Sequence, residues 1–121
     1  MEVQVNKVGH QLSIKATGEY SLSSLCTLFD RVKEESEKFG CGKVKLDLIE
    51  VAGTIPVLDM LVLGEHCAHI WKQSFRVAIL SPDGGLDKFF EDVACNRGVR
   101  LAVHSATRVA YRGQDAYPGK S

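Results

Sequence analysis

The chain has 121 residues, of which 45% are hydrophobic and 25% are charged, and its 15 basic residues balance its 15 acidic ones. This length suits one domain with its own core, and the charge balance argues against general electrostatic binding to nucleic acid or to an anionic membrane. No apolar run reaches the roughly 18 residues of a membrane span, and no signal peptide is visible at the start. We therefore expect a cytoplasmic domain without membrane insertion.

The four cysteines stand apart from one another in the sequence. They are Cys26, Cys41, Cys67 and Cys95, and no Cys-x-x-Cys pair occurs among them. A domain of this size needs no disulfide framework, so we expect reduced thiols in a reducing compartment.

The first third of the chain predicts a hairpin followed by a helix. Apolar and polar residues alternate over 3–5 and 12–16, with Gly9-His10 between them, which indicates two strands joined by a tight turn. Ser21 can cap a helix, and Gly40 can end it in the left-handed conformation. Apolar residues at three- and four-residue spacing between these two positions predict one buried stripe.

The rest of the chain alternates strands and helices. In chain order we predict a strand over 43–48, a helix from Pro56 to about Trp71, a strand over 75–79, a helix with an apolar stripe of Leu86, Phe89, Phe90 and Val93, a strand over 99–103 and a short last helix over 105–111. Residues 112–121 lack periodicity and predict a flexible tail. The domain is therefore expected to span 1–111.

This alternation implies parallel strands joined by crossovers, which is an α/β fold. Strands buried on both faces would be almost continuously apolar, whereas Lys43, Lys45, Asp47, Arg76 and Arg100 alternate with apolar residues here. We therefore predict a mixed, mostly parallel sheet of about five strands, with helices stacked mainly on one face and a wetter opposite face. No Gly-x-Gly-x-x-Gly follows the first strand, so a dinucleotide fold fits less well.

The predicted central helix, from Pro56 to about Trp71, is unusually apolar. Its apolar side chains cover more than the single stripe that a surface helix needs. Either the helix is buried on two sides by its neighbours, or part of its surface meets another protein, a second copy of the chain or an apolar ligand.

The central helix and the strand before it contain residue types that occur in metal sites and in catalysis. His66 and His69, with Cys67 between them, can supply two zinc ligands, but no third is evident, so no metal is expected. Asp47, Asp59 and Glu65 have the chemistry of an acid–base pair. However, no nucleophile, base and orienting group form a set, so we expect no catalytic residue, no cofactor and no enzymatic activity.

The loop before the central helix allows two interpretations. Amide protons at a helix start favour an anion, so Gly53-Thr54 is compatible with a phosphate site. The alternative is a tight turn with a capping threonine. A residue before proline prefers an extended conformation, so either Thr54 or Ile55 is expected to be the cap.

At this point residues 2–111 resemble the STAS superfamily, the sulfate-transporter and anti-sigma-factor-antagonist domain. The resemblance rests on Gly18-Glu19-Tyr20, on the strand VKLDL and on the hinge into a long apolar helix. The runs FRVAIL and FFEDVACNRGVRLAVH look closer to a STAS-like branch linked to CRAL-TRIO lipid-exchange domains. The resemblance implies strands and helices wound as a superhelix, with the helices largely on one face.

The hinge departs from the family's pattern. Antagonist-type members carry Asp-Ser-Ser/Thr-Gly there, and a partner kinase phosphorylates the second hydroxyl. In this chain Ile55, Pro56, Val57 and Leu58 lie across that motif, and Thr54 is the nearest hydroxyl. Val57 cannot accept a phosphate, so control at the usual position is not expected.

The resemblance and the residues together predict a non-catalytic, regulatory protein-interaction module. Its partner is another protein or a second copy, bound through the hinge loop and the central helix, and not nucleic acid. The alternative is a carrier or sensor of a small apolar, lipid-like ligand held between the central helix and its neighbours. The candidate binding residues are Gly53, Thr54, Pro56, Val57, Asp59, Met60 and His66.

Overall fold

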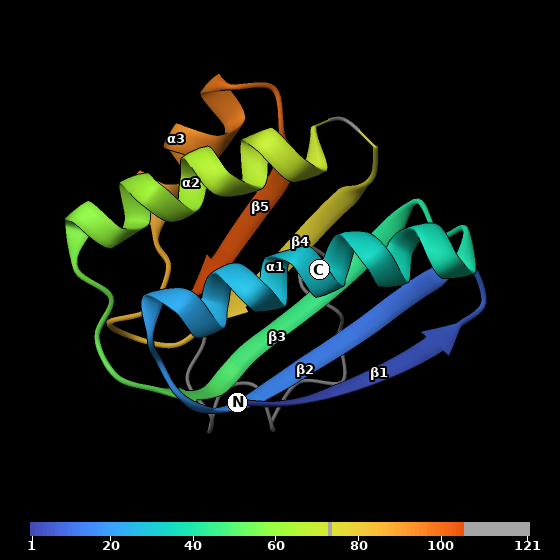
Figure 1. The fold of residues 1–121 in the computed structure, drawn as a ribbon, viewed down its shortest axis with the longest axis horizontal. Helices are drawn as coiled ribbons and strands as arrows, with labels where there is room; N and C mark the ends of the chain where they lie inside the picture. The colour runs from blue at the N-terminus through green and yellow to red at the C-terminus, as the bar shows by residue number, and fades with distance from the viewer. Residues whose placement is uncertain (73, 106–121) are drawn as a thin grey trace.

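The computed structural model describes residues 1–72 and 74–105, which form five strands and three helices (Figure 1). In chain order the elements are β1 (Glu2–Val8), β2 (Gln11–Glu19), α1 (Leu22–Phe39), β3 (Lys43–Ala52), α2 (Val57–Trp71), β4 (Arg76–Ser81), α3 (Lys88–Asn96) and β5 (Arg100–Ser105).

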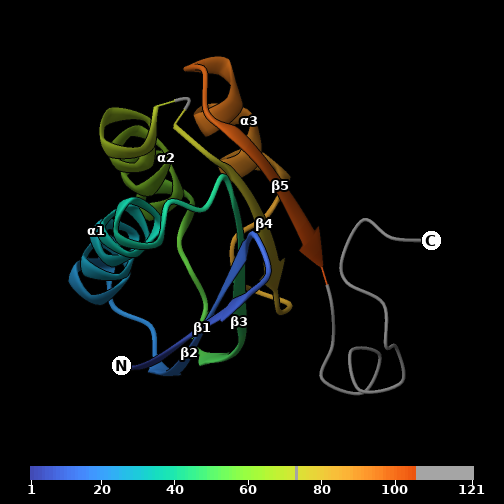
Figure 2. The same ribbon diagram turned by 90° about the vertical axis from the view of Figure 1, so that its right-hand side faces the viewer.

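The strands lie side by side in the order in which they occur in the chain, β1-β2-β3-β4-β5. The hairpin strands β1 and β2 are antiparallel, and the three later pairs are parallel. Each parallel step runs through one helix in the same direction across the sheet, so right-handed crossovers place all three helices on one face. Figure 2 shows this two-layer arrangement. The predicted fold class is confirmed.

The core lies between the sheet and the helix layer. Leu12, Ile14, Leu46 and Ile79 are fully buried on the inner face of the sheet. Aromatic rings join the helices above them: Phe29 of α1 lies 4.8 Å from Trp71 of α2 and 5.9 Å from Phe90 of α3, measured between ring centroids. The Trp71 indole donates a hydrogen bond to the Phe29 carbonyl at 2.9 Å, which satisfies the polar end of this ring.

Both predicted ends of α1 are confirmed. The Ser21 hydroxyl accepts a hydrogen bond from the Ser24 amide at 3.1 Å, and Gly40 ends the helix at φ +64°. The third helix starts later than its apolar pattern predicts, because Asp87 caps it and leaves Leu86 in the preceding loop. The predicted stripe was also wrong for Phe89, which is 42% exposed.

Residues 106–121 lie outside the described part of the chain. The predicted end of the domain at residue 111 and the flexible tail over 112–121 therefore stay predictions, as does the last helix. Ser105, where that helix was expected to begin, is the final residue of β5. Across the described ranges, no helix is both long and apolar enough to span a bilayer.

Candidate functional site

The hinge loop, residues 53–56, leaves the carboxyl end of β3 and is held against the loop that joins β4 to α3, residues 82–87. The Ile55 amide donates a hydrogen bond to the Gly84 carbonyl at 2.8 Å, and the Ile55 side chain is buried. Gly53 adopts φ +110°, a conformation that favours glycine. These contacts fix where α2 begins.

The cap of α2 differs from both alternatives expected from the sequence. Pro56 itself is the N-cap, with φ −64° and ψ 153°, and no side chain caps the helix. Neither Thr54 nor Ile55 has this role. Pro56 has no amide proton, so its extended conformation leaves no donor of its own unpaired, and its carbonyl accepts the first helical bond from Met60 at 3.0 Å.

A hollow of about 430 Å³, here called the hinge hollow, lies beside this loop at the carboxyl ends of the parallel strands. Thr54, Ile55, Val57, Met60, Pro82, Asp83, Gly84, Gly85, Leu86, Asp87 and Ser105 line it. The structure thus brings three of the predicted site residues, Thr54, Val57 and Met60, to one place. Asp83 and Asp87 make the hollow unfavourable for an anion, which argues against the phosphate interpretation of the helix start.

The first turns of α2 expose apolar side chains to solvent. Val57 is 61% exposed, Leu58 76%, Leu61 36% and Val62 44%, and we call these four residues the α2 outer face. Positions i, i+1, i+4 and i+5 are neighbours on a helix, so the four form one patch. The alternative of a helix buried on two sides is therefore wrong for this part of α2.

Met60 belongs to the opposite side of the same helix. It is only 5% exposed and packs in the core with Leu63, Cys67 and Trp71. Met60, a candidate binding residue, can therefore reach a partner only through its edge on the hinge hollow.

Asp59 and His66 lie on the side of α2 that faces α1 and the turn before it. The Tyr20 hydroxyl donates a hydrogen bond to Asp59 at 2.7 Å, and the His66 ring lies 2.9 Å from the Asp30 carboxylate. Burial raises the pKa of Tyr20, and the hydrogen bond and charge of Asp59 raise it further. Both predicted residues thus hold α2 onto its neighbour and stand apart from the outer face.

The groups with catalytic potential are dispersed. All four cysteines are free, and burial raises the pKa of the Cys67 thiol to about 12, which keeps it protonated at neutral pH. Over the part of the chain that the structure describes, no three of His, Cys, Asp or Glu gather closely enough to hold a metal ion. The Ser81 hydroxyl is fully buried without a protein hydrogen-bond partner.

A small cavity lies next to Ser81, behind the hinge loop. Tyr20, Leu48 and Ile55 are among its lining residues, and its volume is about 10 Å³. That is space for about one water molecule, which is too little for a lipid-like ligand.

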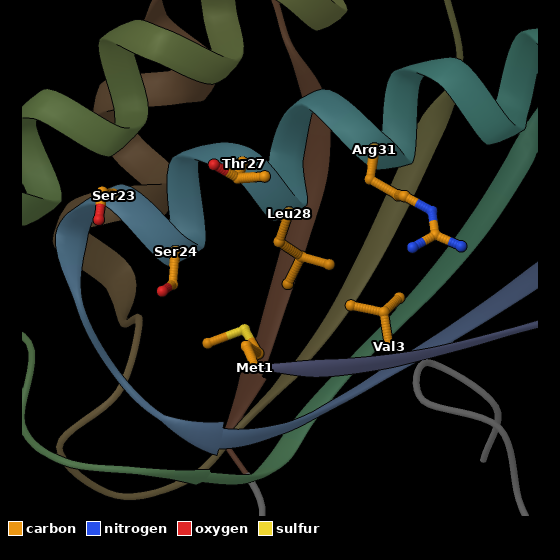
Figure 3. A pocket seen from close by; sticks show the side chains of 7 residues that line it. All are labelled: Met1, Val3, Ser23, Ser24, Thr27, Leu28 and Arg31. Carbon is orange, nitrogen blue, oxygen red and sulfur yellow. The ribbon is translucent and has the colours of Figure 1, made fainter.

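A second open hollow of about 320 Å³ lies between β1 and α1 (Figure 3). Met1 and Val3 point toward the helix, and Ser24, Leu28 and Arg31 approach from it. None of the predicted site residues lines this hollow, and Arg31 is already paired with Glu35 at 3.1 Å.

Comparison with protein families gives no matching family model, and no curated protein matches the chain. Among solved structures, the chain is similar to the anti-sigma factor antagonist SpoIIAA in its unphosphorylated form. The TM-score is 0.49 and the identity 13%, over 95% of this chain and 100% of that chain. The link to CRAL-TRIO domains stays a prediction.

Sequence reasoning missed two parts of the site. Leu58, Leu61 and Val62 were counted among the apolar residues of α2 but were not assigned to its exposed side, and their excess over one stripe was the available signal. Asp83 and Asp87 join the hinge hollow from a loop about thirty residues away in sequence, and no local pattern links them to the hinge.

Proposed function

We propose that this protein is a non-catalytic interaction module of STAS type, which acts in the cytoplasm and binds another protein chain through the α2 outer face and the hinge loop. The observation that carries the proposal is the exposure of four adjacent apolar side chains at the start of α2. Fully burying a leucine or valine side chain contributes roughly 1.5–3 kcal/mol, so a partner that covers this patch gains most at Leu58, which is three-quarters exposed.

The hinge loop gives this surface a fixed shape. Ile55 is buried and bonded to Gly84, so the loop and the first turn of α2 present their groups without first having to become ordered. Thr54, Pro56 and Val57 are exposed around it. Neither Pro56 nor Val57 carries a hydroxyl, so binding here operates without phosphate control at these two positions.

A carrier or sensor of a small apolar ligand is the second candidate. Its support is the hinge hollow, whose volume of about 430 Å³ falls within the range of ligand sites and whose lining combines Val57, Met60 and Leu86 with a few polar groups. A ligand there would lie beside the hinge loop. It would add only its own small mass to the native protein, whereas a bound protein partner would add the mass of a whole chain, so the native mass distinguishes the two candidates.

Native mass spectrometry and affinity capture with matched variants test the proposal. Leu58→Glu places a charge at the centre of the α2 outer face, whereas Val8→Glu places one on a β1 residue that is 63% exposed. We expect wild type and Val8→Glu to capture the same partner, or to form the same homodimer, and Leu58→Glu to lose it. Equal capture by all three proteins would exclude the α2 outer face, and a bound mass of a few hundred daltons would favour the ligand carrier.

A further inference from the structure

The sheet face that lies away from the helices carries a row of three positive charges across neighbouring strands. In the strand register Lys43 lies opposite Arg76, and Arg76 lies opposite Arg100. The next residue in β3 and in β4, Val44 and Val77, is buried in the core. Since side chains alternate between the faces of a sheet, the three cations project from the open face, where all three are exposed.

The surface next to this row is hollowed. One row further along the strands, the open face of β4 and β5 carries only Ala78 and Ala102, which lie opposite each other. A hollow of about 460 Å³ lies here, and Arg76, Arg100 and Ala102 are among the residues that line it. Val77 and Leu101 complete the lining, and the small Ala102 side chain leaves space beside the two guanidinium groups.

The positive row is not neutralised by an ion pair within the described residues. None of the ion pairs in the described ranges includes Lys43, Arg76 or Arg100. Asp47 is the nearest acid along β3 on this face, and it is buried and accepts a hydrogen bond from the Ile49 amide. Like charges opposite one another destabilise a sheet, so the row carries a cost that an anionic ligand would remove.

The distribution of charge along the chain makes the strands more basic than the helices. The three helices contain eight acidic and four basic residues, whereas the five strands contain four acidic and six basic ones. Residues 106–121 contain three basic residues and one acidic residue, so their side chains do not offer a net negative charge to the row. A neutral protein therefore has a basic surface on its open face.

We propose that Lys43, Arg76 and Arg100 form a binding site for a phosphomonoester group carried by a partner protein. A phosphate ester has a charge of about −1.5 to −2 and three acceptor oxygens, which match three cations, whereas a carboxylate has one charge and two oxygens. Neighbouring strands are about 4.8 Å apart, so the two outer side chains can converge on a group above Arg76. Arginine forks bind phosphate oxygens in pairs.

The surroundings of the row favour a protein partner over other carriers of phosphate. No strand of the described sheet contains Phe, Tyr or Trp, so the face lacks the stacking platforms that bind single-stranded nucleic acid. Anionic membranes recruit clusters of about four to eight cations. By alternation Lys15 and Lys45 also lie on this face, but Lys15 is opposite Asp47 in the register and Lys45 has a partner of its own, so the row offers three cations. The hollow is too open to enclose a free metabolite, whereas a phosphorylated side chain keeps most of its contacts on the rest of its own chain.

The test is an NMR titration of the full chain with a blocked Gly-Gly-phosphoserine-Gly-Gly peptide. Its counterparts with serine and with glutamate are titrated in parallel. We expect saturable shifts at the amides of Lys43, Arg76 and Arg100 with the phosphopeptide, and at least tenfold weaker binding of the glutamate peptide. Combining Arg76→Gln with Arg100→Gln should weaken phosphopeptide binding at least tenfold, because charge-assisted hydrogen bonds are lost. Lys7→Gln removes an exposed cation from β1 and should leave it unchanged.

Three results would overturn the proposal. One is equal binding of the phosphoserine and glutamate peptides, and another is unchanged binding by the double variant. The third is tighter binding of a ten-nucleotide single strand, or of vesicles with phosphatidylserine, than of the phosphopeptide. Leu58→Glu should bind the phosphopeptide like wild type, so failure of this site is distinguishable from failure of the α2 outer face. The substituted residues Arg76, Arg100, Lys7 and Leu58 are all exposed. A circular dichroism spectrum of each variant checks that it folds.

Discussion

The hydroxyl of Tyr20 donates a hydrogen bond to the Asp59 carboxylate at 2.7 Å and so connects the residues before α1 to the first turn of α2. The backbone of the same residue connects to the sheet, since the Tyr20 amide donates to the Ala52 carbonyl at 2.8 Å. One residue thus joins the end of β3, the entry to α1 and the start of α2, and it helps to set the position of the hinge loop.

Tyr20→Phe should lower the free energy of unfolding by about 1 kcal/mol, because one hydrogen bond to a half-buried carboxylate is lost. Urea denaturation at neutral pH measures this change. Asp59→Ala and the double variant complete a thermodynamic cycle, and a coupling energy of zero between the two positions would contradict a stabilising bond.

The same bond predicts a loss of stability at alkaline pH. The pKa of Tyr20 is raised in the folded protein, first by burial and then by Asp59, so folding favours the protonated phenol. This contribution is complete below the unfolded pKa of about 10 and is lost as pH rises above that value toward the folded pKa. Between about pH 9 and pH 11 the urea midpoint of wild type should therefore fall more steeply than that of Tyr20→Phe. Parallel slopes would show that other groups cause the change.

Gly64→Ala should destabilise the protein by about 1–3 kcal/mol, because α2 and α3 are in close contact there. A Cβ atom at position 64 would lie 2.5 Å from Val93 Cγ1. Adding Val93→Ala removes that atom and should recover part of the loss in a urea titration. Gly42→Ala is the matched control, since a Cβ atom at position 42 would meet no heavy atom within 4 Å, and it should change stability little.

The thiols should differ in their rates of alkylation by iodoacetamide at about pH 8, since the thiolate is the reactive form. Cys95 is exposed and should react first, whereas Cys67 is fully buried, donates to the Gly64 carbonyl and has a pKa of about 12. Mass spectrometry of tryptic peptides gives the rate at each cysteine. Labelling of Cys67 at the rate of Cys95 in the folded protein would show that the α2 core opens readily.

Much of the fold was predictable because its signals are local. Alternation over 43–48 reports a strand with one buried face, and the polar residues of that pattern place the helices on the other side of the sheet. Ser21 and Gly40 mark the ends of α1 through bonds that span only a few residues. The cap of α2 was missed because proline is usually read as the first helical residue, whereas Pro56 precedes it.

The site was less predictable because its contacts are distant in sequence. Asp59 and His66 are candidate binding residues from the sequence, yet Tyr20 and Asp30, more than thirty residues away, already bind them. Whether Leu58 or Met60 points outward depends on where α1 and α3 flank the helix, which the pattern of α2 alone does not contain. The row of Lys43, Arg76 and Arg100 likewise exists only through the strand register.

The strand order of the sheet bears on how the protein forms during synthesis. Each strand after β1 pairs with the strand that precedes it in the chain. No described strand has to be inserted later between two strands that are already paired. The hairpin and α1 can assemble while the rest of the chain is still being translated, and each following helix and strand then extends an existing template. The parallel pairs join residues that are 24 to 33 positions apart in the chain, so they form more slowly than the hairpin, and β5 is the last of the five strands to be added.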